Sequence, residues 1–230
     1  MKAILAGTSL LHSTLFNNWD EVPVDTPYGK VALRRASQYL FLQRHGKKPV
    51  PPHKINHHAN IWALRSLDVE GVIAVNSVGS LKISLRPGTF VIPDDFVSPW
   101  NIPTFFDHEL RFTVPVMDAT YARKMQDVCT AMEMETTAGG VYVQTTGPRL
   151  ETRAEVNILK KLGDVVGMTM ASEATLCLEY GLPYVSLCAI DNYCNGVLKA
   201  PLTLGEIEEQ VLKNTRSIEA VLQTILGEGF

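Results

Sequence analysis

Residues 72–79 read Val-Ile-Ala-Val-Asn-Ser-Val-Gly, and this stretch decides the class of fold. Four consecutive apolar residues predict a short buried strand. We expect the strand to stop at Asn76, where polar and small residues with a glycine take over. Small residues at the end of a strand allow a ligand to approach the backbone closely.

Strand and helix patterns alternate along the rest of the chain. Further strands are predicted at 3–6, 31–33, 39–43, 89–92, 141–144 and 183–190. Helices are predicted at 56–67, 121–134, 152–161, 172–180 and 204–226, and Ser172 is expected to cap its helix. This alternation indicates an α/β fold. No repeat or polar linker interrupts it, so we expect a single domain over residues 1–230.

The composition excludes several classes of protein. The 230 residues are 46% hydrophobic and 20% charged, which is typical of a globular protein and not of a disordered one. A net charge of -3 and a pI near 6.1 argue against a nucleic-acid partner. No run of 18 apolar residues predicts a membrane span. The N-terminal segment reaches Gly7 too early for a signal peptide.

The four cysteines show neither a CxxC pair nor zinc-ligand spacing with histidines. We therefore expect reduced, mostly buried thiols in a cytoplasmic protein, and no metal site. His12, His57, His58 and His108 are expected to be surface residues or fully hydrogen-bonded ones.

Polar residues gather where the predicted strands end. In α/β sheets ligands bind outside the carboxyl ends of the strands, so these residues predict one shared pocket. The pairs concerned are Thr8-Ser9, Arg44-His45, Asn76-Ser77 and Asp191-Asn192.

The same loops have the chemistry of an anion site. The Arg44 guanidinium can hold phosphate with two parallel hydrogen bonds, with His45 beside it. The turn after the first strand offers backbone N–H groups and the Thr8 hydroxyl, and Thr169 offers another hydroxyl. Taken singly, each piece is equally compatible with an ordinary turn or a surface charge. Together they are typical of a phosphate site assembled from separate loops, without lysine or metal ligands.

Longer stretches carry a resemblance to a known family. In order along the chain they are Ala6-Gly7-Thr8-Ser9, Pro27-Tyr28-Gly29, Arg44-His45-Gly46, 51–56, 59–64, 76–81, 147–155, 166–169 and 185–193. In order and spacing the chain resembles the trimeric nucleoside phosphorylases over nearly its whole length. That family includes purine nucleoside, methylthioadenosine and methylthioinosine phosphorylases, and the methylthioinosine branch is the most similar.

The resemblance implies a fold and a reaction. The fold is a central, twisted, mixed sheet flanked by helices, in a chain that forms a homotrimer. In the reaction inorganic phosphate, the co-substrate, attacks C1′ of a purine nucleoside and releases free purine and a ribose 1-phosphate. The family uses no metal and no organic cofactor.

The resemblance also implies roles for single residues. Phosphate is expected to contact Thr8, Arg44, His45, the backbone N–H of Ser77, and Thr169. Met168 is expected to pack against the ribose.

The purine is expected to contact Asn192 and Glu151. Members that act on 6-oxopurines have Asn at the position of Asn192, where 6-aminopurine enzymes have Asp. An Asn amide donates to O6 and accepts from N7–H, and an ionised Glu151 accepts from N1–H, which adenine lacks. Glu151 could also serve only as a carboxylate at a helix start.

Some positions depart from the family pattern. Ala6 and Ser9 replace glycines, Leu150 replaces a phenylalanine near the base, and Asp191 replaces a threonine and adds a carboxylate near the purine. The segment at 112–114 shows no counterpart of the residue that a neighbouring subunit lends to the ribose. These departures leave open a methylthioadenosine phosphorylase, or a purine-binding homologue with little turnover.

The segment at 201–207 would close the pocket at the 5′ end of the sugar. No histidine follows His108, so Leu202, Leu204 or Ile207 is expected to line an apolar slot for a 5′-methylthio group. The alternative is that these side chains only contact the core.

Overall fold

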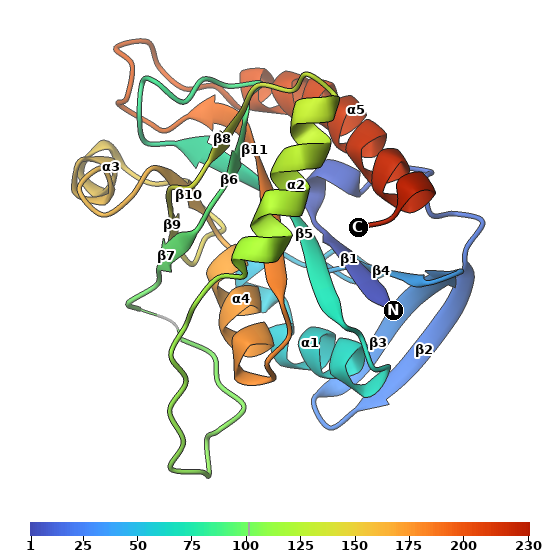
Figure 1. Cartoon of the computed structure of the whole chain (residues 1–230). Coiled ribbons are helices and arrows are strands. Elements are labelled where there is room, and N and C mark those ends of the chain that lie inside the picture. Colours follow the sequence, from blue (N-terminus) through green and yellow to red (C-terminus); the bar gives the residue numbers. More distant parts are fainter. Residues whose placement is uncertain (101) are drawn as a thin grey trace.

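Strand β5 (Gly71–Ser80) is the axis of the sheet in the computed structural model, which describes residues 1–100 and 102–230 (Figure 1). The expectation that this strand stops at Asn76 is wrong. Strand β11 (Tyr184–Tyr193) pairs with β5 in parallel along almost its full length. This ladder satisfies the backbone groups of the polar residues after Val75, so the strand continues to Ser80.

The sheet is mixed, as expected. Its main path runs β2-β3-β4-β1-β5-β10-β9-β7, and β11, β6 and β8 extend it from β5. The bounds of these strands are β1 (Lys2–Ala6), β2 (Asp20–Thr26), β3 (Gly29–Ala36), β4 (Tyr39–Gln43), β6 (Phe90–Ile92), β7 (Asp95–Val97), β8 (Thr136–Ala138), β9 (Val141–Gln144) and β10 (Val165–Gly167).

The sheet forks along one edge of β5. Strand β1 pairs with the first half of that edge, up to Leu5 opposite Ala74. Strand β10 pairs with the same edge in the antiparallel sense, at Gly79 and Ser80. The stretch of β5 between these two pairings faces the carboxyl ends of β1 and β4, where an α/β sheet binds its ligands.

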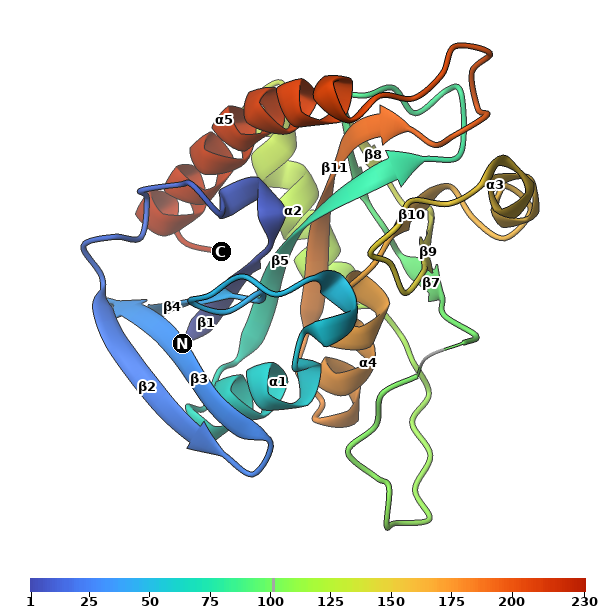
Figure 2. The ribbon, with the colours of Figure 1, turned by 180° about the vertical axis from the view of Figure 1, so that it is seen from behind.

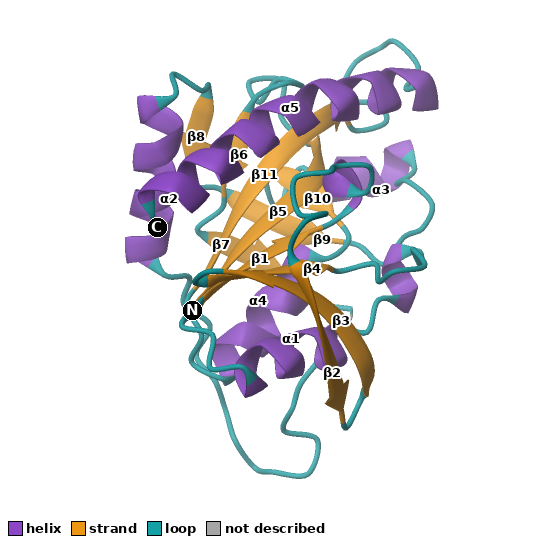
Figure 3. Cartoon of the chain, turned by 90° about the vertical axis from the view of Figure 1, so that its right-hand side faces the viewer, coloured by secondary structure: helices purple, strands orange, loops and turns teal. Residues whose placement is uncertain are grey.

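Helices cover both faces of the sheet (Figure 3). On one face α1 (His57–Ser66) and α4 (Met170–Glu179) bury aliphatic side chains against the strands. On the other face α5 (Leu204–Glu228) also buries aliphatic side chains, whereas α2 (Ala119–Ala131) buries Tyr121, Met125 and Cys129. The short α3 (Arg153–Leu159) lies beyond β9 and β10 at the margin of the sheet (Figure 1).

Helix α4 begins earlier than predicted, and Ser172 does not cap it. The N-cap is Thr169, and the hydroxyl oxygen of Tyr142 accepts the N–H groups of Thr169 and Met170 at 3.2 and 3.3 Å. Ser172 lies in the first turn, where its hydroxyl accepts a hydrogen bond of 2.6 Å from Gln144 Nε2. The hydroxyl of the buried Tyr142 thus accepts N–H groups at the start of α4, the role that we expected of Ser172.

A long loop, residues 102–117, leaves the body of the protein between β7 and α2 (Figures 1 and 2). Its side chains Leu110, Phe112, Val114 and Val116 are largely exposed. The four cysteines are free and buried, as expected. No helix within the described residues is both long and apolar enough to cross a membrane.

Candidate active site

A pocket of about 680 Å³ opens at the fork of the sheet. The predicted site residues that line it are Thr8, Arg44, His45, Ser77, Leu150, Glu151, Met168, Thr169, Asp191, Asn192 and Leu202. They come from the ends of β1, β4, β10 and β11, from β5 and from loops. Side chains far apart in the sequence therefore share one cavity.

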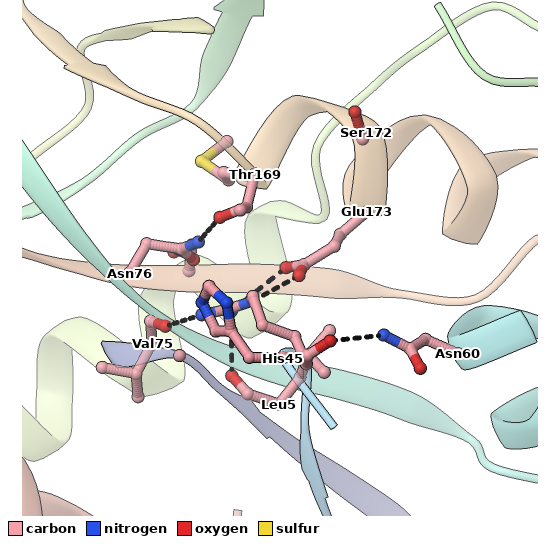
Figure 4. Close-up of polar contacts among 12 residues, drawn as sticks. Leu5, His45, Asn60, Val75, Asn76, Thr169, Ser172 and Glu173 are labelled. Atoms are coloured by element: carbon pink, nitrogen blue, oxygen red, sulfur yellow. Dashed lines mark hydrogen bonds and ion pairs between the residues drawn. The ribbon is translucent and has the colours of Figure 1, made fainter. Parts of the chain in front are cut away.

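Arg44 lies at the floor of the pocket and is only 3% exposed. Its Nε and Nη2 donate to the two carboxylate oxygens of Glu173, at 2.5 and 3.2 Å (Figure 4). Nη1 donates to the Val75 carbonyl oxygen at 2.9 Å, and Nη2 also donates to that of Leu5. Four of the five N–H groups are therefore used inside the protein, and one hydrogen on Nη1 is left for a ligand.

This geometry differs from the sequence expectation for Arg44. Glu173, and not a ligand, occupies the two-pronged face of the guanidinium that we had assigned to phosphate. Burial opposes the charge of Arg44, but the paired carboxylate outweighs it, and the pKa of Arg44 lies above its usual value. The arginine stays charged while its neighbour neutralises it.

The imidazole of His45 also lines the pocket. Its Nδ1 lies 2.7 Å from the Val50 carbonyl oxygen, which places the proton of the neutral ring on Nδ1 and leaves Nε2 for a ligand. Burial lowers the pKa of His45; the Val50 carbonyl opposes this and the Arg44 charge adds to it. At neutral pH the ring is therefore mainly neutral, and Nε2 can accept a hydrogen bond.

Hydroxyl groups from three segments face the same space. The hydroxyl groups of Thr8 and Ser77 lie 3.4 Å apart, which joins the turn after β1 to the middle of β5. The hydroxyl of Thr169 accepts a 2.8 Å hydrogen bond from Asn76 Nδ2. This set of donors suits a tetrahedral oxyanion.

A bulge in β11 shapes the next part of the pocket. The pairing with β5 shifts between Ile190 and Asn192, so Asp191 is the extra residue. In a regular strand, neighbouring side chains face opposite sides, but here Asp191 and Asn192 both line the pocket. One hydrogen bond of the Asn192 amide goes to the Tyr193 carbonyl oxygen, which leaves its Oδ1 and a second N–H for a ligand.

Asp191 is buried and tied to α5. Its Oδ1 accepts a 2.7 Å hydrogen bond from Asn214 Nδ2. Burial raises its pKa to about 6, against the hydrogen bonds from Asn214 and Ser77. The carboxyl group therefore titrates close to neutral pH, where a threonine would carry no charge.

Glu151, Leu150 and Met168 lie on the side of the pocket formed by the segment before α3 and by the end of β10. Glu151 is buried, and its Oε1 accepts a 2.7 Å hydrogen bond from the Thr145 hydroxyl, which leaves Oε2 for a ligand. Leu150 is half-exposed at the rim.

The wall formed by α5 and the segment before it differs in part from the expectation. Leu202 and Ile207 line the pocket as predicted, together with Val211. Leu204 does not: it is 69% exposed and lies outside the lining. Leu204 is the first residue of α5 and shares a helix face with Ile207, but the cavity lining includes Ile207 and not Leu204.

Sequence reasoning missed three polar residues of the pocket, His12, Asn195 and Glu208. His12 follows the 3₁₀ turn at Thr8–Leu10, and Glu208 belongs to the first turns of α5, which passes over that 3₁₀ turn (Figure 2). Their proximity depends on tertiary packing, and no local motif shows it. His57 also differs from expectation, since its buried Nδ1 has no hydrogen-bond partner.

No three His, Cys, Asp or Glu side chains in the described part of the chain form a cluster that could hold a metal ion.

Comparisons with known proteins agree with this geometry. The family model for the phosphorylase superfamily matches residues 3–227. The chain is 37% identical to a probable S-methyl-5′-thioinosine phosphorylase of Methanocaldococcus jannaschii, covering 100% of this chain and 93% of the relative. It is 35% identical to a probable 6-oxopurine nucleoside phosphorylase of Archaeoglobus fulgidus, covering 97% and 94%.

Two further similarities concern enzymes of adenine nucleosides. The chain is 33% identical to an S-methyl-5′-thioadenosine phosphorylase of Hyperthermus butylicus, covering 97% of this chain and 86% of the relative. The solved structure of methylthioadenosine phosphorylase from Schistosoma mansoni in complex with adenine superposes with a TM-score of 0.83 at 26% identity. That match covers 96% of this chain and 88% of the other.

Proposed function

The chain belongs to the phosphorylase superfamily, and from this premise we propose that it cleaves 6-oxopurine nucleosides with inorganic phosphate. The preferred substrate is 5′-methylthioinosine, and the products are hypoxanthine and 5-methylthioribose 1-phosphate. Phosphate is a co-substrate, and the reaction needs no other cofactor.

One observation carries the proposal: anion donors and purine-pairing groups line the same pocket at a suitable separation. Asn192 pairs with Gly79, two residues along β5 from Ser77. Two residues of strand span about 7 Å, which leaves room for a ribose between the two sets of groups. Relatives at 35–37% identity are named as enzymes of this reaction class.

The chemistry follows from the positions of these groups. Phosphate held by Thr8, Ser77 and Thr169 lies beneath C1′, and the remaining Arg44 N–H adds a charged hydrogen bond. Because neutral His45 presents a lone pair at Nε2, it pairs with a protonated oxygen of phosphate. As the C–N bond breaks, negative charge develops on the purine.

The purine side of the pocket accommodates that charge. Asn192 donates to O6 and accepts from N7–H of the leaving base, and Glu151 accepts from N1–H. An adenine has no N1–H, so Glu151 favours hypoxanthine. Asp191, which is fixed to Asn214, faces the same space and is the feature that favours a 6-aminopurine as the alternative base.

The 5′ end of the sugar separates two candidate substrates. The apolar wall of Leu202, Ile207 and Val211 favours a methylthio group. His12 and Glu208 favour a second candidate, inosine, because either side chain can pair with a 5′-hydroxyl.

We also propose that the enzyme is a homotrimer. The exposed apolar side chains Leu110, Phe112, Val114 and Val116 form a surface of the kind that subunit contacts cover. The base of their loop is fixed to the body, since Glu179 accepts hydrogen bonds from the Thr104 hydroxyl and the Phe105 N–H, both of 2.6 Å. A neighbouring subunit would supply the residue that completes the ribose site.

A panel of nucleosides tests the proposed function. Inosine, guanosine, adenosine and their 5′-methylthio forms are each incubated with and without phosphate, and free purine is measured. We expect strict phosphate dependence and fastest release from 5′-methylthioinosine. Equal release without phosphate would indicate a hydrolase, and faster release from adenine nucleosides would assign the base preference to Asp191.

A further inference from the structure

Asn76 lies next to two of the proposed phosphate-binding residues, Ser77 and Thr169, without lining the pocket itself. It is 1% exposed, on β5 one residue before Ser77. Both ends of its amide are used: Nδ2 donates to Thr169 Oγ1 at 2.8 Å, and Oδ1 accepts from Ser186 Oγ at 2.7 Å. Figure 4 shows the Asn76 amide directed at Thr169.

The proton count at Thr169 determines what it offers to a ligand. A hydroxyl carries one hydrogen and two lone pairs. Because one lone pair accepts from Asn76, the hydrogen of Thr169 is not needed in that contact. Within residues 1–100 and 102–230 no protein group accepts it, so it is available to the pocket.

The direction of the amide therefore matters. With the amide reversed, Thr169 would donate to the Asn76 oxygen and would turn lone pairs toward an anion. In the orientation that the structure has, Ser186 donates to Asn76, and its own oxygen takes part in a 3.4 Å contact with Cys188 Sγ. The result is a buried chain of hydrogen bonds that runs from Ser186 through Asn76 to Thr169.

We propose that Asn76 is a positioning residue for phosphate, which holds the Thr169 hydroxyl as a hydrogen-bond donor to the bound oxyanion. The inference rests on the proposed function, because the anion is the phosphate of the phosphorolysis. The Thr169 donor is important in this pocket because Glu173 already accepts two of the Arg44 N–H groups. Neutral donors must then carry a larger share of phosphate binding.

A double-mutant cycle tests whether Asn76 acts through Thr169. Asn76→Leu removes the amide at similar size, and Thr169→Val removes the hydroxyl. We expect each single variant to raise the KM for phosphate by about tenfold, with the KM for the nucleoside changed less than about twofold. In the Thr169→Val background, Asn76→Leu should add less than about twofold.

Asn76→Asp gives a second, directional test. A carboxylate can only accept, so it would draw the Thr169 proton away from phosphate and add a negative charge. The KM for phosphate should rise further than with Asn76→Leu. Thr175→Val is the matched control, since its hydroxyl lies on the same helix and donates to the Ala171 carbonyl oxygen. Its KM values should equal those of the wild type.

Phosphate binding is also measured without turnover, as the rise in Tm caused by inorganic phosphate alone. If Asn76→Leu does not fold, Ser186→Ala releases the amide oxygen and should weaken the same response. Equal effects of Asn76→Leu in both backgrounds, or an unchanged phosphate KM, would overturn the proposal. A phosphate response that depends on Asn76 and Thr169, in a protein that cleaves no nucleoside, would refute the proposed function and leave this inference standing.

Discussion

Arg44 and Glu173 form a buried ion pair at the floor of the pocket, each almost fully shielded from solvent. The pair fixes the guanidinium in place, and Tyr184 donates a further 3.0 Å hydrogen bond to the same carboxylate. Charge neutralised in this way attracts phosphate less than a free arginine would. The ion pair therefore holds the Arg44 N–H groups in fixed positions, but it weakens the long-range attraction of the arginine for phosphate.

Removing one partner of this pair should be costly. Glu173→Gln leaves the Arg44 charge buried without a counter-charge, which typically costs about 3–5 kcal/mol of unfolding free energy. Urea titration of the wild type and the variant measures the loss.

A second variant separates the charge from the packing. Arg44→Met combined with Glu173→Leu replaces both charges by apolar groups and should be more stable than Glu173→Gln alone. A double variant that is less stable than the single one would show that the ion pair itself stabilises the fold.

Asp191 makes stability depend on pH. Its pKa in the folded protein is about 6, against an ordinary 3.8, so the folded state binds this proton more tightly than the unfolded chain. Stability from this group is fully present below about pH 4 and is lost as the pH rises through 6. The loss is about 3 kcal/mol, from roughly two pH units at about 1.4 kcal/mol each.

Asp191→Asn should remove this dependence. The unfolding free energy of the variant relative to the wild type should rise by about 3 kcal/mol between pH 4 and pH 8, measured by urea titration. Groups shared by both proteins, such as Glu155 with its low pKa, cancel in the difference. A constant difference across this range would contradict the assignment.

At the scale of elements, the parallel pairing of β5 with β11 positions Asn192, the proposed purine-binding residue. Gly79 lies against β11, and a Cβ atom there would come within 2.7 Å of Cys194 Sγ and 3.3 Å of Asn192 Nδ2. A glycine is therefore needed for the close approach of these two strands.

Gly79→Ala should displace Asn192 and raise the KM for the nucleoside by about tenfold, an effect of about 1.4 kcal/mol. The KM for phosphate should change little, because Ser77 and Thr169 lie outside the contact. Steady-state kinetics with each substrate varied in turn gives both values.

Cys194→Ala in the Gly79→Ala background provides the control. Loss of the sulfur makes room for the added methyl group, so part of the nucleoside affinity should return. If Cys194→Ala gives no recovery, the displacement of Asn192 has another cause.

The elements that could be predicted from the sequence are the central, buried ones. The apolar runs of β1, β4 and β11 have a pattern that follows from burial, and the structure confirms them. Strand β2 escaped prediction because it is a solvent-exposed edge strand that contains Pro23. Strands β7 and β8 have three residues each, too short for any periodicity.

The candidate site could likewise be predicted only in part from the sequence. Arg44, Ser77 and Asn192 were expected in one pocket because strand ends meet at one edge of a sheet, and Thr169 was expected to add a hydroxyl to the phosphate site. The ion pair with Glu173 and the entry of His12 depend on side-chain packing between distant segments. The bulge at Asp191 depends on the register between β11 and β5, which the sequence of either strand alone does not specify.

At the scale of the whole molecule, α5 connects the pocket to the outer layer. Thr215 on this helix donates a 2.7 Å hydrogen bond to the Ser9 carbonyl oxygen, and Asn214 holds Asp191. The helix thus packs over the turn after β1 and over β11 at once. Its first turns line the pocket where we propose that the 5′ end of the sugar binds, so on this proposal the position of α5 decides which sugars fit.

This wall predicts a preference for the 5′-methylthio group. Burying an extra methyl-sized group contributes about 1 kcal/mol, and a buried hydroxyl without a partner costs roughly 1–3 kcal/mol. Together they predict a kcat/KM for 5′-methylthioinosine that exceeds the value for inosine by about 10- to 1000-fold. Competition between the two nucleosides measures the ratio directly.

Three variants assign the origin of this ratio. Ile207→Ala removes part of the apolar wall and should lower the ratio, whereas Leu204→Ala, at an exposed position of the same helix, should leave it unchanged. His12→Leu removes the nearby imidazole. If His12 pairs with the 5′-hydroxyl, this variant loses activity on inosine alone and the ratio rises. Equal use of both nucleosides by the wild type, with a loss confined to inosine in His12→Leu, would establish the 5′-hydroxyl as the group that this pocket recognises.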